Sequence, residues 1–340
     1  MTIEYGIIGC QHAHIEIFME EMGRLGHHCA GIYESGDRAL AESIAKRYDC
    51  TVLDTVDRLL APDIAIIGSS AVNSEKIAII ELCERHGKSI MVDKPAIVNS
   101  GGLERLRAVI ERGQIQVGML LTERYHPAIY TLKQLIDAGE LGELVTIGMR
   151  KPHRLNAASR PEWFFDKYLC GGILIDLLIH DYDLLHWLMG AAVEASVGVV
   201  GKSVLPEHPT FYNTVQVQAT LSDGRVAQLY ADWHTPEQSW TWGDGRIFVT
   251  GTRGFAELRL SGEPATDGAS LLLLVSDTRS WGTVELQSPP VSITEDFMRR
   301  CAGEAGQLTH RDILAAHEAV VQADREVRYM EIAGEGGERR

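Results

Sequence analysis

Short apolar strands alternate with helical patterns over about the first 120 residues, and this alternation limits the fold more than any other feature of the chain. Strands are predicted at Glu4–Ile8, His28–Tyr33, Ile64–Ile67, Ser89–Val92 and Gln114–Met119. Segments between them, such as Ala39–Tyr48 and Ser74–His86, have the periodicity of helices. Strands joined by crossover helices run parallel, with helices on both faces of the sheet. We therefore expect a doubly wound parallel sheet as the first domain, over residues 1–122.

The pattern changes after His126-Pro127 and predicts a second domain over residues 123–340. A helix is expected at Ala128–Ala138, a strand at Leu144–Arg150 and a long helix at Gly172–Met189. Further strands are predicted at Ala195–Val200, Thr214–Leu221, Val226–Trp233, Arg246–Thr250 and Phe255–Leu260. Short turns between consecutive strands indicate an α+β domain with a largely antiparallel open sheet. A closing helix is expected over Asp312–Tyr329 and a frayed tail over Gly334–Arg340.

Charge excludes two classes of partner. The chain has 47 acidic against 32 basic side chains and a net charge of -15, which repels nucleic acid and an anionic membrane surface.

The first residues enter a predicted strand directly, so no signal peptide is expected. Six scattered cysteines without a C-x-x-C pair indicate neither a zinc site nor a disulfide framework. These features favour a reducing, cytoplasmic location.

The turn after the first predicted strand is placed where a dinucleotide fold binds the pyrophosphate. Gly9 matches the first glycine of G-x-G-x-x-G, but Gln11 and His14 occupy the second and third glycine positions. The strict motif therefore fails, and an ordinary strand-to-helix turn remains an equally good interpretation of this segment alone. If the turn binds a dinucleotide, we expect His12 and His14 to lie near its phosphates or nicotinamide. The predicted cofactor-binding residues of this turn are Gly9, Cys10, Gln11 and His12.

Glu34 strengthens the cofactor interpretation, although a solvated strand-end carboxylate remains the alternative. It ends the second predicted strand, 25 residues after Gly9, where an acidic side chain binds the ribose hydroxyls and repels a 2′-phosphate. This favours NAD over NADP, although Arg38 nearby leaves NADP possible. Ser69, Asp93 and Lys94 complete the predicted cofactor-binding residues.

Two separated motifs resemble the glucose–fructose oxidoreductase, inositol dehydrogenase and MocA (Gfo/Idh/MocA) family. Asp93-Lys94-Pro95 is similar to the family's Glu-Lys-Pro, and the segment from Gly171 to His180 is similar to its Gly-Gly-Gly-x-x-x-Asp-x-x-x-His. Arg124-Tyr125-His126-Pro127 resembles its Arg-Phe-x-Pro, and the resemblance runs to about Arg328.

The resemblance implies an N-terminal Rossmann domain and a C-terminal domain whose open sheet forms a homodimer or homotetramer. It also implies NAD(P)-linked oxidation or reduction of sugars or cyclitols, and a cis bond before Pro95 that directs Lys94 into the cleft. The sequence departs from the family's pattern at three places. Asp93 is shorter than the usual Glu, Gln11 and His14 replace glycines, and Ser74 stands where the family often has histidine.

The predicted helix 172–189 is apolar around most of its circumference, yet Asp176, His180 and Asp183 share one face. Buried polar groups need partners, so this stripe must face a polar cleft or be paired internally. We predict Lys94, Asp176 and His180 as catalytic residues. His180 is assigned as the base, Lys94 as the group that stabilises alkoxide charge and Asp176 as a ligand of a substrate hydroxyl. The roles of Lys94 and His180 can also be exchanged.

Loop residues at strand ends are the predicted substrate contacts, because such loops carry specificity in two-domain clefts. They are Arg124, His153, Arg154, Arg160 and Trp163. No metal site is predicted. Zinc sites usually need three or four donors, and no cysteine pair supports either the stripe on helix 172–189 or the pair His12 and His14.

The sequence thus predicts an NAD(P)-dependent dehydrogenase or reductase that acts on a sugar, polyol or cyclitol. Two alternatives remain open. One is a non-redox NAD-dependent glycosidase or lyase that oxidises its substrate transiently. The other is a catalytically silent, cofactor-sensing binding protein.

Overall fold

The computed structural model describes residues 2–331 and separates into two compact units. The first consists of Met1–Thr122, Tyr168–Gly171 and Val291–His317, and the second of Glu123–Lys167, Gly172–Pro290 and Glu318–Arg340. The first unit thus runs unbroken to the position where the first domain is predicted to end. It also takes in two later segments that the sequence does not mark.

The first unit is built on a six-stranded parallel sheet with the order β3-β2-β1-β4-β5-β6. Its strands are β1 (Glu4–Cys10), β2 (His28–Tyr33), β3 (Val52–Leu53), β4 (Ile66–Ser70), β5 (Ser89–Val92) and β6 (Val117–Met119). Its helices are α1 (Ile15–Arg24), α2 (Ala39–Arg47), α3 (Asp57–Leu60), α4 (Lys76–Arg85), α5 (Ser100–Arg112) and α9 (Ile293–Cys301). The strand order reverses between β1 and β4, and doubly wound sheets bind ligands at the carboxyl ends of strands beside such a reversal. This sheet confirms the predicted fold class of the first domain.

The second unit contains a nine-stranded sheet with the order β14-β13-β12-β11-β7-β10-β9-β8-β15. Its strands are β7 (Leu144–Pro152), β8 (Val193–Lys202), β9 (Thr214–Leu221), β10 (Val226–Asp232), β11 (Arg246–Gly251), β12 (Gly254–Arg259), β13 (Leu271–Ser276), β14 (Arg279–Thr283) and β15 (Arg328–Glu331). Two pairs, β7 with β10 and β8 with β15, are parallel, and the other pairs are antiparallel. The predicted, largely antiparallel sheet is confirmed.

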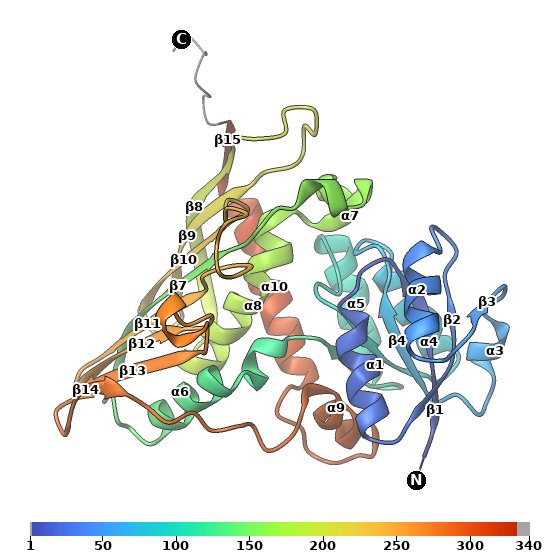
Figure 1. Cartoon of the computed structure of the whole chain (residues 1–340), viewed down its shortest axis with the longest axis horizontal. Helices are drawn as coiled ribbons and strands as arrows, with labels where there is room; N and C mark the ends of the chain where they lie inside the picture. The colour runs from blue at the N-terminus through green and yellow to red at the C-terminus, as the bar shows by residue number, and fades with distance from the viewer. Residues whose placement is uncertain (1, 332–340) are drawn as a thin grey trace. The chain divides into compact units, whose positions relative to one another are not determined.

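One face of this sheet is covered by the long helix α8 (Gly172–Met189), which contacts β7, β8, β9 and β10 (Figure 1). In β9, Val215 and Val217 are buried while Gln216 and Gln218 are exposed, as expected for a sheet with one covered face. The remaining helical segments are η1 (Thr122–Tyr125), α6 (Pro127–Asp137), η2 (Ala157–Ser159), η3 (Glu162–Phe165), α7 (Lys167–Cys170), η4 (Pro264–Thr266) and α10 (His310–Glu326).

Several element boundaries differ from the prediction. The strand expected from Ile64 begins at Ile66, and the one expected from Gln114 begins at Val117. The closing helix ends at Glu326 rather than Tyr329, because the chain then enters β15 and pairs with β8. The predicted tail Gly334–Arg340 lies outside the described residues. Within residues 2–331, no helix is both long and apolar enough to cross a membrane.

Candidate functional site

The turn after β1 requires glycine at position 9. Gly9 has φ +82°, a region that L side chains rarely adopt, and a Cβ there would lie 2.4 Å from the Cβ of Ala71. The sequence match to the first glycine of a dinucleotide turn therefore corresponds to a real steric requirement of this backbone.

This requirement predicts that Gly9→Ala costs about 2–3 kcal/mol of stability, from a strained φ and a clash with Ala71 together. Gly26 supplies a matched control, because it has φ +81° but a Cβ added there would meet no atom within 4 Å. Gly26→Ala should cost only about 1 kcal/mol, the strain alone. Urea unfolding of both variants measures the difference, and equal losses would show that the Ala71 contact is relieved without cost.

Glu34 ties this turn to the end of β2. Its Oε2 accepts a hydrogen bond from the backbone N–H of Cys10 at 2.6 Å, and its Oε1 accepts one from Gly36 at 2.6 Å. The side chain is only 4% exposed, so the alternative of a solvated carboxylate is wrong. A carboxylate has about four acceptor positions, which leaves capacity for ribose hydroxyls.

Gln11 occupies the second glycine position of the motif, and hydrogen bonds also tie it to neighbouring segments of the first unit. Its backbone N–H donates to the carbonyl of Ser70 at 2.8 Å, and its Nε2 donates to the carbonyl of Asp37 at 3.0 Å. The side chain therefore lies against the loop that follows Glu34. Because the N–H groups of Cys10 and Gln11 already have protein acceptors, we expect a pyrophosphate to use the amides that follow them.

Asp93 lies just beyond the carboxyl end of β5 and is completely buried. Its carboxylate forms an ion pair with Lys76 and accepts a hydrogen bond from His12 Nδ1 at 3.0 Å. Burial alone would raise the pKa of Asp93, but Lys76 and His12 outweigh it and hold the pKa at about 2. The carboxylate is therefore ionised at neutral pH.

Lys76 is a site residue that the sequence reasoning missed. Its side chain is fully buried, and its Nζ also donates to Asn73 Oδ1 at 2.7 Å and to the carbonyl of Asp93 at 3.1 Å. A lysine in the first turn of an amphipathic helix looks like a surface residue, and only its position relative to Asp93 marks it as buried.

Lys94 and Ser69 lie at the same carboxyl edge of the parallel sheet. The Lys94–Pro95 bond is cis, as the family resemblance implies, and Lys94 is buried, with 7% of its surface exposed. Ser69, in β4, is fully buried, and its carbonyl accepts the N–H of Asp93 at 2.9 Å. All predicted cofactor-binding residues thus belong to the first unit.

Asp176 and His180 belong to α8 of the second unit and are 7% and 9% exposed. They lie one helical turn apart, so both side chains project from one face of the helix. The helix supports them by packing its apolar residues on the sheet, which leaves little freedom for α8 to shift or rotate.

Other polar residues of α8 are paired within the unit. Asp181 forms an ion pair with Lys151 at 3.0 Å, and Lys151 also pairs with Glu123. Burial raises the pKa of Asp181, which the Lys151 ammonium opposes. Tyr182 shares a hydrogen bond with Ser196 at 2.8 Å. Lys151 and Glu123 were not predicted as site residues, because neither falls in a sequence motif.

Asp183 and Arg124 form a buried bidentate ion pair. Arg124 Nε and Nη2 donate to the two carboxylate oxygens at 2.8 and 2.6 Å, and Arg124 and Asp183 are 2% and 1% exposed. This contact anchors η1 to α8 and gives Arg124 a structural role that the sequence did not predict. A contact between Arg124 and substrate stays a prediction.

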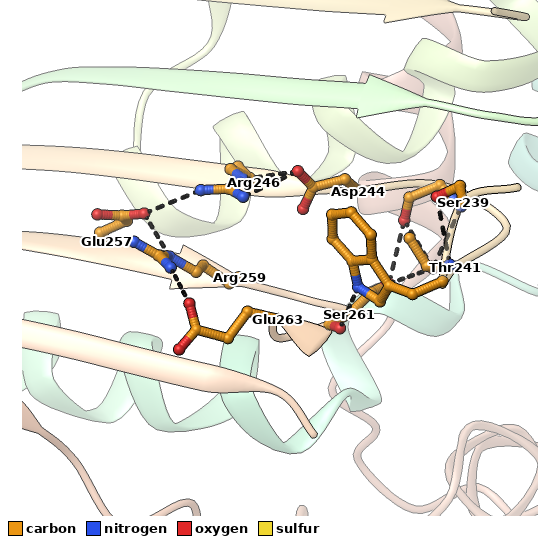
Figure 2. Close-up of polar contacts among 10 residues, drawn as sticks. Ser239, Thr241, Asp244, Arg246, Glu257, Arg259, Ser261 and Glu263 are labelled. Atoms are coloured by element: carbon orange, nitrogen blue, oxygen red, sulfur yellow. Dashed lines mark hydrogen bonds and ion pairs between the residues drawn. The ribbon is translucent and has the colours of Figure 1, made fainter. Parts of the chain in front are cut away.

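The predicted substrate residue Arg154 organises a loop of the second unit. Its Nη2 donates to the carbonyl of Ser239 at 2.6 Å, and its backbone N–H donates to the carbonyl of Trp242 at 2.8 Å. Thr241 Oγ1 bonds to Ser261 Oγ at 2.8 Å, which fixes the same loop to the end of β12. Figure 2 shows Ser239 and Thr241 beside Ser261, next to the ion pairs of Arg246 with Asp244 and Glu257.

Aromatic rings gather around another predicted substrate residue, Arg160. Its guanidinium lies over the rings of Phe164, Trp233 and Trp242, at 4.2, 5.0 and 5.8 Å from their centroids. His153 packs edge-on against Trp233 at 5.6 Å, and the predicted residue Trp163 packs against Phe164 at 6.4 Å. The structure thus brings His153, Arg160 and Trp163 into one aromatic cluster, although their contact with substrate stays a prediction.

Comparison with known proteins adds independent information. Residues 3–120 match a family model described as an oxidoreductase family with an NAD-binding Rossmann fold, and residues 129–257 match the GFO/IDH/MocA C-terminal domain. The chain is 28% identical to inositol 2-dehydrogenase of Rhizobium meliloti over 277 residues, which cover 75% of this chain and 74% of that protein. A match to inositol 2-dehydrogenase of Burkholderia vietnamiensis is 27% identical and covers 56% of this chain and 55% of that protein.

Solved structures share the fold at low sequence identity. A protein from Erwinia carotovora atroseptica described as an oxidoreductase superimposes with a TM-score of 0.86 at 23% identity, covering 96% of this chain and 99% of that one. Levoglucosan dehydrogenase in complex with NADH superimposes with a TM-score of 0.79 at 18% identity, covering 96% and 98% of the two chains.

Proposed function

Because the chain belongs to the Gfo/Idh/MocA family of oxidoreductases with an NAD-binding Rossmann fold, we propose that it transfers hydride between a nicotinamide cofactor and a sugar, polyol or cyclitol. The observation that carries this proposal is the pair Asp176 and His180, which share one face of a buried helix. An acid–base pair so placed suits chemistry at a carbon that bears a hydroxyl group.

The first unit fits a dinucleotide. The turn at Gly9 cannot accept a Cβ, Glu34 lies at the end of β2, and the strand order reverses between β1 and β4. The turn and the start of α1 would hold the pyrophosphate, and Glu34 would hold the adenosine ribose. When bound, the nicotinamide ring supplies the hydride acceptor or donor.

Three side chains perform the proposed proton chemistry. His180 takes the proton of the reacting hydroxyl, because a neutral imidazole is an acceptor near neutral pH. Lys94 offsets the negative charge that develops on the same oxygen, and Asp176 accepts a hydrogen bond from a neighbouring substrate hydroxyl. The alternative assignment, in which Lys94 and His180 exchange roles, uses the same two side chains.

A screen of NAD and NADP with cyclitols, hexoses, sugar acids and polyols tests the proposal. We expect stoichiometric formation of NADH with at least one of these substrates. Product formed without net NADH would favour the non-redox glycosidase or lyase, in which the hydride returns to the substrate. Tight dinucleotide binding without turnover across the whole panel would favour a cofactor-sensing protein.

Glu34 should set the cofactor preference. We expect NADH to bind at least roughly tenfold more tightly than NADPH, because a 2′-phosphate beside a buried carboxylate costs about 1.4 kcal/mol or more. Arg38, whose guanidinium pairs with the exposed Asp54 at 3.1 Å, is a nearby cation that would offset part of this cost. Glu34→Gln keeps the shape of the side chain and should narrow the preference. Tighter binding of NADPH to the wild-type chain, measured by fluorescence titration, would contradict this assignment.

The family resemblance also implies association through the open sheet of the second unit, as a homodimer or homotetramer. The exposed face of this sheet carries Val145, Val197 and Phe248, which are 47%, 64% and 37% exposed. We keep this assembly as a prediction.

A further inference from the structure

Three metal-ligating side chains converge at the carboxyl edge of the parallel sheet in the first unit. His12 and His14 follow β1, and Asp93 follows β5, 81 residues beyond His12. One ligand atom from each of these residues lies within 4.8 Å of the other two. The two imidazole rings are 4.1 Å apart between centroids, and His12 Nδ1 lies 3.0 Å from Asp93 Oδ2.

We propose that His12, His14 and Asp93 bind a divalent transition-metal ion of the zinc type, with a fourth position left open for water or an anion. Two imidazoles and one carboxylate are a common donor set for Zn²⁺ when a coordination position stays open. Imidazole nitrogen favours Zn²⁺ and its neighbours over Mg²⁺ or Ca²⁺, which prefer oxygen ligands.

The distances are close to those that coordination needs. Zinc bonds of about 2.1 Å at tetrahedral angles separate neighbouring donors by about 3.4 Å. The His12–Asp93 pair, at 3.0 Å, is already near this spacing. The widest pair of donors must approach by about an ångström or a little more, which rotation of an imidazole can supply.

Lys76 prepares the carboxylate for this role. It holds one oxygen of Asp93 in an ion pair, so the other oxygen is directed to His12. Partners of this kind orient a metal ligand and fix which oxygen is offered. The Lys76 charge also cancels that of Asp93, so the bound cation would favour an anion as its fourth ligand.

The sequence alone shows too few donors here for a metal site to be predicted, because only His12 and His14 are close along the chain. The alternative set on α8 is weaker in the structure, since both oxygens of Asp183 already bind Arg124. Among the residues that the structure describes, the group at the β1 turn is the only one with three converging donors.

Equilibrium dialysis of the full chain against ZnCl₂, without a polyhistidine tag and without dinucleotide, tests the site. We expect one Zn²⁺ per chain, and at least about a tenfold loss of affinity in His14→Ala and in His12→Ala. Co²⁺ should give the intense visible absorption of a tetrahedral ion, and both variants should lose it. Asp93→Asn is avoided because it would leave Lys76 buried without its counter-ion.

Two controls separate this site from other donors. His86→Ala removes an exposed histidine of the same unit and should leave Zn²⁺ affinity unchanged. Cys50→Ser removes a half-buried free thiol of the same unit and should also leave Zn²⁺ affinity unchanged. Unchanged Zn²⁺ binding in His12→Ala and His14→Ala, loss in Cys50→Ser, or no binding at all would each overturn the proposal. None of these outcomes depends on whether the chain binds NADH.

Discussion

Replacing His180 with Asn should lower kcat by about 100-fold or more on the physiological substrate, the usual contribution of a positioned acid–base group. NADH affinity should stay nearly unchanged, because His180 belongs to the second unit and the predicted dinucleotide residues belong to the first. Asparagine keeps a polar side chain of similar size on α8, so the fold should persist. Steady-state kinetics and NADH titration on the same preparations measure both effects.

The same helix provides a matched control. His186 lies on α8 but outside the face shared by Asp176 and His180, and His186→Asn should keep kcat within a factor of a few. Lys94→Met should also lower kcat, because it removes the charge that stabilises the developing alkoxide. If His180→Asn and Lys94→Met both kept near wild-type kcat, the proposed catalytic residues would have to be abandoned.

The architecture followed from hydrophobic periodicity wherever an element was long. The parallel sheet and α8 were predicted because runs of buried apolar residues have a clear period. β3 has only two residues, so no period can mark it. The end of α10 was placed too late because β15 forms by pairing with β8, a long-range contact that the local sequence does not show.

The candidate site was predictable where residues fall in motifs. Lys94, Asp176 and His180 were predicted in this way and their catalytic roles stay predictions, whereas Gly9 was predicted from its position after β1. Their partners were not, because a partner is defined by contacts across distant segments.

Buried charges show this limit most clearly. Lys76 and Lys151 look like ordinary surface lysines in the sequence, yet both are buried in ion pairs with aspartates. The sequence marked Asp183 only as part of a polar stripe on α8, and its bidentate pairing with the distant Arg124 is visible only in the structure.

That pair carries the second large prediction. Replacing Arg124 with Met should destabilise the second unit by about 3–5 kcal/mol, because it leaves the carboxylate of Asp183 buried without its counter-charge. Methionine fills much of the space of the arginine stem, so little of this loss comes from packing. Urea unfolding followed by a signal from the second unit measures the change.

A double variant shows whether the loss of stability comes from the unpaired charge of Asp183 or from the missing Arg124 side chain itself. Arg124→Met combined with Asp183→Leu removes both charges and should recover most of the stability, since apolar replacements of a whole buried pair are often neutral or stabilising. Arg299 and Glu295 form the matched exposed pair, at 2.7 Å with side chains 47% and 33% exposed. Because water screens that pair, Arg299→Met should cost less than about 0.5 kcal/mol. If Arg124→Met costs no more than Arg299→Met, the Arg124–Asp183 contact does not hold η1 on α8.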